Sequence, residues 1–559
     1  MTLGHSDLLF AAQSSHNVTG FHHDGISQQL VYAPSKWLLL AGCASTICYR
    51  HWLSIPPPSL SGHGGIPDED VPSVTIIRPV KGLEPHLYEC LASTFHQNYP
   101  SEKLFFHFCV ESTRDPAYHI LRQLFHDFPH HNIRIFIESE APRDLNLGPN
   151  PKIRNMSRAY HAAPGDFIWI VDCNAWIGKE NCGHMIDKLN GWAPGRDFGV
   201  KYKFVHNLPL IVAVDGDTSC NCQTQQDKDG PFFSQYGEVL AVGPEGLQEM
   251  SIRDRMKSGL DNGGGRLEEL FFASAHGKMY TAINTVCVAP CIVGKSTMFR
   301  KSHLDSLTQR LNSSPTTPLN RPIRGNGLDY FSDNICEDHL IGDVLWKHKV
   351  PEEIANQGKW KKHNLIRGDL AIQPVSHMAV RAFCNRRVRW LRVRKFTVPA
   401  ATLVEPNTES ILASLHLAFA VTTLLPLAFP RYTEHLRSWC CFWSIWATSM
   451  TVWAVTDWAL YIMMHSCQAV AADDNTPMFA RPRTGRRKEC LSRRPFYQWF
   501  IAWVGRELLA FPIWAWGVLF GSTVVWRDRK FKVGFDTFVK EIDGGEEGSS
   551  QGGGNKGGK

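Results

Sequence analysis

The stretch DFIWIVD, residues 166–172, decides the predicted fold. Five apolar residues follow one another in it, and the acid Asp172 comes directly after them. A run of this kind is typical of a central strand in a parallel sheet that helices cover on both faces. Asp172 therefore stands at the carboxyl end of a predicted strand, where open α/β sheets bind their ligands.

Strands and helices alternate in the residues before this stretch. Strands are predicted in SVTIIRPV (73–80), KLFFHFCV (103–110) and IRIFIES (133–139). Helices are predicted in LYECLASTFHQ (87–97), PAYHILRQLFHDF (116–128) and MSRAYHAA (156–163). This order predicts an α/β fold with an open sheet. Three stretches rich in Gly, Asp, Asn, Pro and Ser interrupt the alternation and are predicted to be loops or insertions: residues 181–198, 215–266 and 309–326.

An apolar stretch, residues 35–53, follows the polar, His-rich residues 1–34. It is just long enough to span a bilayer, and a buried core helix is the alternative interpretation. Arg50 and His51 close the stretch, which favours a cytosolic position for the residues that follow. We therefore predict a transmembrane anchor at 35–53 and a cytosolic α/β domain after it.

The C-terminal part of the chain contains three more apolar segments: 411–429, 439–464 and 500–526. They predict a helical membrane region over residues 396–530. Arg506 and Glu507 interrupt the last segment, which allows its first part to lie in the membrane interface. The Gly-rich tail, residues 543–559, is expected to be disordered.

Charge and cysteine usage narrow the class of protein. The net charge is +6, and basic residues gather at 381–395 and 481–494, beside apolar stretches. Such clusters favour the cytosolic membrane face and anionic lipid headgroups. Because no basic patch lies elsewhere in the sequence, we expect no nucleic-acid partner. The 16 cysteines show no metal-ligand spacing, so free thiols in a reducing compartment are predicted.

Two groups near the predicted strand suit a phosphorylated ligand. Asp172 could hold a divalent cation that neutralises a diphosphate, although an Asp at a strand end also starts ordinary turns. In NPKIRN, residues 150–155, Lys152 could pair with phosphate and Asn155 could hydrogen-bond a base or ribose. The alternative for NPKIRN is a Pro-initiated turn that leads into a helix.

Two further groups lie later in the chain. Glu337 and Asp338 open the helical run DHLIGDVLWKH, and Asp338 could act as a general base toward an acceptor hydroxyl. A helix N-cap is the alternative for this pair. In RRVRW, Arg386 and Arg389 suit bidentate phosphate contacts, and Trp390 offers a flat wall for a sugar or lipid headgroup. A basic helix face beside the membrane is the alternative for RRVRW.

Taken together, these groups form an ordered series that resembles the membrane glycosyltransferases with a D, D, D, (Q/R)xxRW pattern. Within that group the chain resembles the ceramide glucosyltransferases, as a fungal-type member with insertions. The matching stretches are spread over residues 72–410: RPVKG (78–82), NPKIRN, WIVD, VHNLP (205–209), CIVGKSTMFRK (291–301), EDHL, RRVRW and LVEP (403–406). The resemblance implies a GT-A type nucleotide-diphospho-sugar transferase domain over residues 72–395.

The resemblance also implies roles for particular residues. It assigns Asp172 to the diphosphate and to a divalent cation, Mg²⁺ or Mn²⁺, and it makes Asp338 the catalytic base. It places His206, in VHNLP, near the acceptor, although a lone His is more often structural. The residues with an implied substrate contact are Glu111, Lys152, Asn155, His206, Glu337, Arg386, Arg389 and Trp390.

The first acidic position of the family pattern is missing here. The residues after the second predicted strand are Glu111 and Ser112, with Ser at the position where the family has Asp. Glu111 or Asp115 could contact the nucleotide instead, or Ser112 could contribute only a hydroxyl. The sequence Asp-Cys-Asn at 172–174 also lacks a second carboxylate, which predicts a modest metal affinity.

The expected activity is inverting glucosyl transfer from UDP-glucose to ceramide at a Golgi or other endomembrane, with the lipid bilayer as a partner. A lipid acceptor cannot leave the bilayer cheaply, because each buried methylene is worth about 0.8 kcal/mol. A processive polysaccharide synthase of chitin or hyaluronan type is one alternative, which a polymeric product would reveal. A non-catalytic membrane scaffold is the other, and Ser112 is its best support.

Overall fold

The computed structural model describes residues 42–49, 52, 55–141, 146–193, 195, 198–214, 259–314, 322–483, 493–527 and 529–542. The chain divides into two compact units. The larger unit comprises Leu40–Leu412 and Met450–Lys559, and the smaller one includes Ala413–Ser449. All the strands of the described residues belong to the larger unit, which contains the predicted α/β domain.

An eight-stranded sheet forms the centre of the larger unit, with the strand order β3-β2-β1-β4-β7-β6-β8-β5. Strands β3, β2, β1 and β4 are parallel, whereas β7 runs antiparallel to β4 and β6, and β5 antiparallel to β8. The predicted α/β fold is thus confirmed, as a mixed sheet. The strands are β1 (Val74–Pro79), β2 (Leu104–Val110), β3 (Asn132–Ile137), β4 (Phe167–Val171), β5 (Trp176–Ile177), β6 (Val200–Ala213), β7 (Ser296–Arg300) and β8 (Lys359–Val375).

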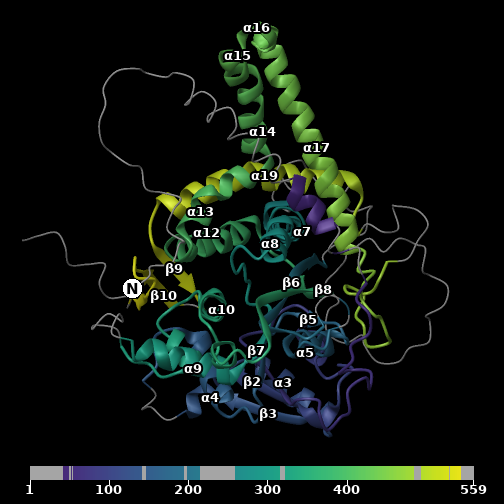
Figure 1. Cartoon of the computed structure of the whole chain (residues 1–559), viewed down its shortest axis with the longest axis vertical. Coiled ribbons are helices and arrows are strands. Elements are labelled where there is room, and N and C mark those ends of the chain that lie inside the picture. Colours follow the sequence, from purple (N-terminus) through teal and green to yellow (C-terminus); the bar gives the residue numbers. More distant parts are fainter. Residues whose placement is uncertain are drawn as a thin grey trace, which may run out of the picture. The chain divides into compact units, whose positions relative to one another are not determined.

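Helices pack around this sheet (Figure 1). The α-helices whose described residues belong wholly to the larger unit are α2 (Leu87–Ala92), α3 (Ala117–Asp127), α4 (Pro151–His161), α5 (Asn181–Asn190), α7 (Gly264–Ala273), α8 (Ala275–Val286), α9 (Lys301–Asn312), α10 (Glu337–Lys347), α11 (Pro351–Ile354), α12 (Val380–Thr397), α13 (Pro399–Val404) and α19 (Phe496–Leu519). The short 3₁₀-helices of this unit are η1 (Ser101–Lys103), η2 (Glu138–Glu140), η4 (Gly327–Phe331) and η5 (Glu405–Thr408).

The apolar runs of the central strands are buried on both faces of the sheet. Because successive side chains of a strand point to opposite faces, each strand contributes to two hydrophobic clusters. Trp169 of β4 belongs to one cluster, with Phe106 of β2. Ile168 and Ile170 of β4 belong to the other, with Ile153 of α4. This two-sided burial explains why DFIWIVD shows no polar alternation.

One predicted loop is wrong. Residues 181–190 form helix α5, and Cys182, Met185, Ile186 and Leu189 are buried against the sheet. Their spacing of three, one and three residues is that of an amphipathic helix, but the surrounding Asn and Gly residues hide it. The other two predicted insertions lie partly outside the described residues, at 215–258 and 315–321.

The structure describes the predicted membrane segments to different extents. Within the predicted anchor 35–53, residues 42–49 are described and are helical; residues 1–34 and 543–559 lie outside the described residues. By length and composition, one described helix, Ser410–Ala428, is long and apolar enough to cross a membrane. This helix comprises α14 (Ser410–Phe419), the π-helix η6 (Ala420–Leu424) and α15 (Leu425–Ala428), and it is followed by α16 (Pro430–Thr433), η7 (Glu434–Leu436) and α17 (Trp439–His465).

The last predicted segment, 500–526, is only partly helical. Helix α19 ends at Leu519, and Thr523–Trp526 form strand β9 of a second, three-stranded antiparallel sheet with β10 (Arg529–Val533) and β11 (Val539–Glu541). The prediction of one continuous membrane segment is therefore wrong at its C-terminal end. The physical reason is that Arg392 of α12 binds the Phe520 and Thr523 carbonyls and ends the helix there.

Candidate active site

Helix α4 delivers Lys152 to the carboxyl end of β4. Asn150 caps the helix, because its Oδ1 accepts hydrogen bonds from the backbone N–H groups of Lys152 at 2.8 Å and Ile153 at 3.1 Å. Pro151 occupies the first helical position, where its missing N–H costs nothing. NPKIRN thus forms the Pro-initiated turn and helix of the alternative interpretation, and this local structure also fixes the direction of the Lys152 side chain.

Four residues predicted from the sequence meet in one cluster. Lys152 Nζ lies 3.2 Å from an oxygen of each of Asp172, Glu337 and Asp338. Burial disfavours the Lys152 charge, but Asp172, Asp338 and Glu337 together hold the pKa of the ammonium group well above its usual range. The amino end of α4, the carboxyl end of β4 and the amino end of α10 therefore converge on a single charged site.

Lys295 completes this cluster, and sequence reasoning missed it. The residue precedes β7, and its Nζ lies 3.0 Å from Asp172 Oδ2 and 2.9 Å from Asn174 Oδ1. Burial alone would raise the pKa of Asp172, but Lys152 and Lys295 hold it well below its usual range. Asp172 is therefore ionised and lies between two cations.

The two acids of α10 differ in access to solvent. The Glu337 side chain is 3% exposed, and its Oε2 accepts a hydrogen bond from Asn150 Nδ2 at 3.1 Å. The Asp338 side chain is 31% exposed. The N-cap of α10 is Cys336, so the alternative of an N-cap role for this pair is wrong. Asp338 is thus the acid of this pair that a bound molecule can reach. Glu337 is buried and pairs with the Lys152 ammonium group.

Glu337 gives the site a pH dependence. Burial and then the Asp338 charge raise its pKa to about 7 from an ordinary value of 4.5. Between those two values the folded protein binds more protons than the unfolded one, so stability falls as the pH rises through this window. We expect Glu337→Gln to remove this fall. Thermal unfolding of the purified protein at pH 4.5, 6 and 7.5 measures it, and parallel melting profiles for variant and wild type would contradict the assignment.

Gly294 leaves the space that Asp338 occupies. A Cβ atom at this position would collide with the Asp338 carboxylate. We expect Gly294→Ala to lower kcat about 100-fold by displacing that carboxylate, since a misplacement of about 1 Å has effects of this size. Gly505→Ala is the matched control, because a Cβ there makes only an ordinary contact with Leu267. Equal kcat values for both variants would show that the Asp338 position is not critical.

Two predicted site residues take part in buried contacts of the surrounding fold. Asn155 is buried, and its Nδ2 donates to the Cys109 carbonyl at 3.0 Å, which holds the end of β2 against α4. His206 on β6 is also buried, with its Nδ1 2.6 Å from Tyr280 Oη and its ring stacked on His363.

The predicted nucleotide edge lies at the ends of β1 and β2. Glu111 is 44% exposed, and its two oxygens lie 3.6 Å from Lys81 Nζ and 3.7 Å from an Arg529 nitrogen. The Asp115 carboxylate accepts the Gly82 N–H at 3.0 Å and therefore holds the turn after β1. Ser112 Oγ accepts the Arg114 N–H at 3.2 Å. Of the three candidates for the missing acidic position, Glu111 and Asp115 carry carboxylates, and that of Asp115 is already bound to the backbone of Gly82.

The RRVRW residues lie on helix α12. Arg386 pairs with the buried Glu268 of α7 at 3.1 Å, and the Trp390 ring packs edge-on against Phe272. Burial and then the like charge of Arg386 lower the pKa of Arg389 to about 10, and this guanidinium has no hydrogen bond or ion pair within the part of the chain that is described. Arg389 is thus the cation of this motif that remains available to an anion.

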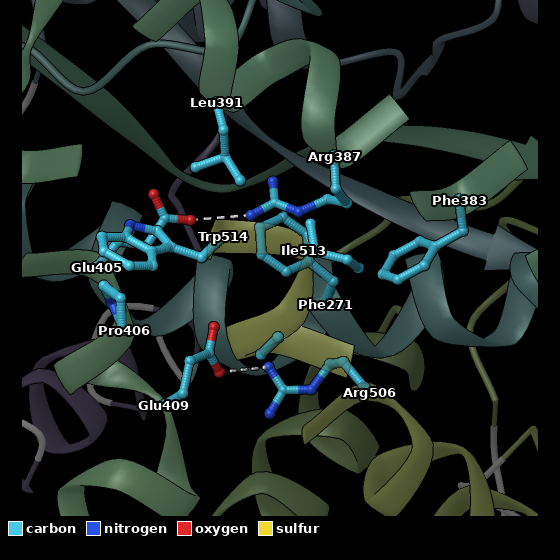
Figure 2. Close-up of a pocket in the computed structure, with 11 residues that line it drawn as sticks. Phe271, Phe383, Arg387, Leu391, Glu405, Pro406, Glu409, Arg506, Ile513 and Trp514 are labelled. Atoms are coloured by element: carbon cyan, nitrogen blue, oxygen red, sulfur yellow. Dashed lines mark hydrogen bonds and ion pairs between the residues drawn. The ribbon is translucent and has the colours of Figure 1, made fainter. Parts of the chain in front are cut away.

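A small cavity lies beside this motif (Figure 2). Its walls combine apolar side chains with two ion pairs, Arg387–Glu405 at 2.9 Å and Arg506–Glu409 at 3.1 Å. The volume is about 30 Å³, which is room for a water molecule or two and not for a substrate. The cavity therefore belongs to the packing between α12, α19 and η5.

Among the described residues, Asp172 is the acid whose place at the end of β4 fits a divalent cation. No group of three or more His, Cys, Asp or Glu side chains in the described ranges could hold a metal by itself. Asp172 is 24% exposed and lies at the carboxyl end of β4, the edge of the sheet where open α/β sheets bind ligands. Mg²⁺ is commonly bound by one or two carboxylates together with substrate phosphates. The site therefore fits a cation that arrives with its diphosphate.

Sequence comparison identifies the family. The model of glycosyl transferase family 21 matches residues 38–195 and 324–539. This chain belongs to glycosyl transferase family 21. The first matched part contains Lys152 and Asp172, and the second contains Glu337, Asp338 and Trp390, so the family match includes both sides of the charged cluster.

Similar proteins cover nearly the whole chain. A ceramide glucosyltransferase of Pyricularia oryzae is 44% identical over 525 residues, covering 92% of this chain and 95% of that protein. One of Gibberella zeae is 43% identical over 505 residues, covering 88% and 89%. One of Candida albicans is 30% identical over 523 residues, covering 85% and 89%. The family 21 chain described here is therefore a glycosyltransferase, which sets aside the scaffold alternative.

Proposed function

We propose that this family 21 enzyme transfers glucose from UDP-glucose to the primary hydroxyl of ceramide with inversion, giving β-glucosylceramide. The observation that carries the proposal is the cluster in which Lys152 Nζ lies 3.2 Å from Asp172, Glu337 and Asp338. It combines an accessible base with the cations that a departing diphosphate needs. The similarity to ceramide glucosyltransferases supports the choice of donor sugar and acceptor.

Asp338 acts as the general base in the proposed reaction. Its carboxylate takes the proton of the ceramide hydroxyl while that oxygen attacks the anomeric carbon and the bond to UDP breaks. The Lys152 ammonium group lies 3.2 Å from this carboxylate and donates a hydrogen bond to it, which fixes the position of the Asp338 side chain. Glu337 takes no proton from the substrate, because it is buried behind Lys152.

The charge of the departing UDP is balanced on the opposite side of the cluster. Lys152 and Lys295 lie 3.2 Å and 3.0 Å from Asp172, so two ammonium groups are placed at the end of β4. Ammonium groups in such a partly desolvated position stabilise a developing negative charge. Asp172 would hold the divalent cation, Mg²⁺ or Mn²⁺, which supplies further charge neutralisation when bound.

The remaining contacts are assigned by position. Glu111 lies at the end of β2, where the nucleoside of a GT-A type domain is expected. Asn155 binds the backbone of that strand through the Cys109 carbonyl. Arg389 offers its guanidinium to the diphosphate, and Trp390 lies at the acceptor side. His206 supports the acceptor region through Tyr280.

Helix α19 presents an apolar surface suited to a bilayer. Trp499, Trp503 and Ile513 are buried against the larger unit. The opposite side of α19 exposes large apolar residues: Phe496, Tyr497, Phe500, Ile501, Leu508, Phe511, Trp516 and Leu519. A helix of this kind lies in the plane of the membrane interface, with its apolar face toward the acyl chains. We therefore propose an enzyme whose catalytic domain faces the cytosol on a Golgi or other endomembrane.

An assay of purified membranes with ceramide and a panel of nucleotide sugars tests the proposal. We expect release of UDP and formation of a lipid with a single glucose only from UDP-glucose. A polymeric product would favour the polysaccharide synthase instead. Transfer of a different sugar would correct the donor while leaving the mechanism in place.

A further inference from the structure

The C-terminal sheet of β9, β10 and β11 lies beside α10 and α12 (Figure 1). We refer to Thr523–Glu541 as the C-terminal meander. Val524, Phe531, Val533 and Val539 form its small core together with Val393 of α12. Ile335 and Cys336, the two residues before Glu337 and Asp338, pack against this core. The meander therefore supports the loop that precedes the proposed base.

Hydrogen bonds fix the same loop. The Val539 N–H donates to the Asp333 carbonyl at 2.9 Å, and Asn334 Nδ2 donates to the Thr537 carbonyl and hydroxyl, both at 3.0 Å. The Asn334 carbonyl in turn accepts a hydrogen bond from Asn150 Nδ2, the group that also binds Glu337. A continuous path of polar contacts thus joins the meander to the Lys152 cluster.

The turn between β9 and β10 reaches the ends of β1 and β2. Lys81 Nζ donates to the Arg527 carbonyl at 3.2 Å, and the Arg529 guanidinium lies 3.7 Å from Glu111 and 3.6 Å from Glu541. Both of these distances are too long for hydrogen bonds. Arg529 is 40% exposed, and within the described residues its guanidinium makes no hydrogen bond. Its donors therefore remain available to a ligand at this edge.

We propose that the C-terminal meander is part of the donor site and that Arg529, together with Lys81, binds the nucleoside diphosphate. This inference rests on the proposed function, since the edge next to Glu111 is where the donor nucleoside is expected. Arg529 suits the role because a guanidinium binds phosphate oxygens in a bidentate manner.

The proposal has a consequence for membrane topology. A segment that hydrogen-bonds to Asp333 and Asn334 must lie on the same side of the membrane as the catalytic domain. We expect protease added to sealed vesicles to remove an epitope tag at Lys559 as readily as it cuts the catalytic domain. A tag that stays protected until detergent is added would overturn the proposal.

Binding of UDP to the full-length protein in detergent, measured by titration calorimetry, tests the role of Arg529. We expect Arg529→Ala to weaken UDP binding and to raise the donor KM about tenfold, with kcat and the ceramide KM within about twofold of wild type. Arg529→Lys should recover part of the affinity. Lys532→Ala is the matched control, because it removes the same charge from an exposed position on the same strand, and it should change nothing.

The outcomes separate this proposal from the one on which it rests. Unchanged UDP affinity in Arg529→Ala, with wild type binding UDP, overturns the role of the meander and leaves the proposed function intact. A wild-type protein that binds no UDP overturns both. If Arg529→Ala does not fold, the Arg529→Lys titration and the protease experiment still decide, since each gives a defined result with a folded protein.

Discussion

Asp338→Asn is expected to lower kcat about 1,000-fold while UDP binding stays close to that of wild type. The variant keeps the size of the side chain and removes the proton acceptor, and loss of a general base typically costs 10²–10⁴-fold. Donor binding survives because Asp172, Lys152 and Lys295 still surround the proposed diphosphate position. Initial rates with UDP-glucose and ceramide, alongside UDP titration, measure both quantities.

Asp343→Asn is the control for this variant. Asp343 lies on the same helix and forms an ion pair with Lys347 at 2.7 Å, so the substitution removes an equal charge from α10 outside the cluster. Its kcat should remain within about twofold of wild type. If Asp338→Asn keeps more than a tenth of the wild-type kcat, another group takes the proton, and the proposed role of Asp338 is wrong.

Asp172→Asn should strongly reduce transfer because it removes a charge and the proposed metal ligand, not the base. The substitution removes the negative charge between Lys152 and Lys295, and with it the carboxylate proposed to hold a cation at the end of β4. We expect a fall in kcat/KM of about 1,000-fold, in the range reported for loss of one electrostatic contact to a transition state and of a metal ligand. The membrane-bound fraction should stay unchanged.

Asp166→Asn is the control for Asp172→Asn. Asp166 lies at the opposite end of the same strand, where its carboxylate binds the Ser302 N–H at 2.7 Å. The control should retain nearly full activity. Equal losses in both variants would mean that any charge change around β4 disrupts the fold, and the effect could then not be assigned to the site.

The part of the site that follows local patterns could be predicted from the sequence. DFIWIVD is buried on both faces as its apolar run requires, and Pro151 opens a helix as NPKIRN indicates. Glu337 and Asp338 open helix α10. Because strand and helix ends are marked by short signals, the positions of Lys152, Asp172 and Asp338 followed from them, and the structure brings the three side chains together.

Lys295 could not be predicted because its partner is distant in the sequence. It reaches Asp172 only because β7 pairs antiparallel with β4, with Ser296 opposite Val171. No local pattern specifies that pairing. CIVGKSTMFRK carries a lysine before a strand, but a single lysine at such a position is usually solvent-exposed.

The C-terminal meander could not be predicted, because the apolar composition of its first strand continues that of the helix before it. Residues 500–526 look like one apolar segment, and the strand Thr523–Trp526 is separated from α19 only by a short turn. The error at 181–190 has a similar origin, since Asn and Gly obscured the apolar spacing of α5. The family match extends to residue 195, so this helix belongs to the shared fold and not to an insertion.

The arrangement of RRVRW is the least predictable feature. The sequence predicted substrate contacts for Arg386, Arg389 and Trp390, yet within the described residues no hydrogen bond or ion pair joins them to the Lys152 cluster. Arg386 is held by Glu268, a buried acid on α7 that no motif marks. A role at the diphosphate for this motif therefore rests on Arg389.

A structure of the full-length enzyme with bound UDP in a lipid nanodisc tests the central claim most directly. We predict diphosphate oxygens within hydrogen-bond distance of Lys152 or Lys295, the nucleoside at Glu111, and the Asp338 carboxylate open toward the side where α19 meets lipid. A nucleotide bound elsewhere, with Lys152 still paired with Asp172, Glu337 and Asp338 as in the protein without ligand, would contradict the account.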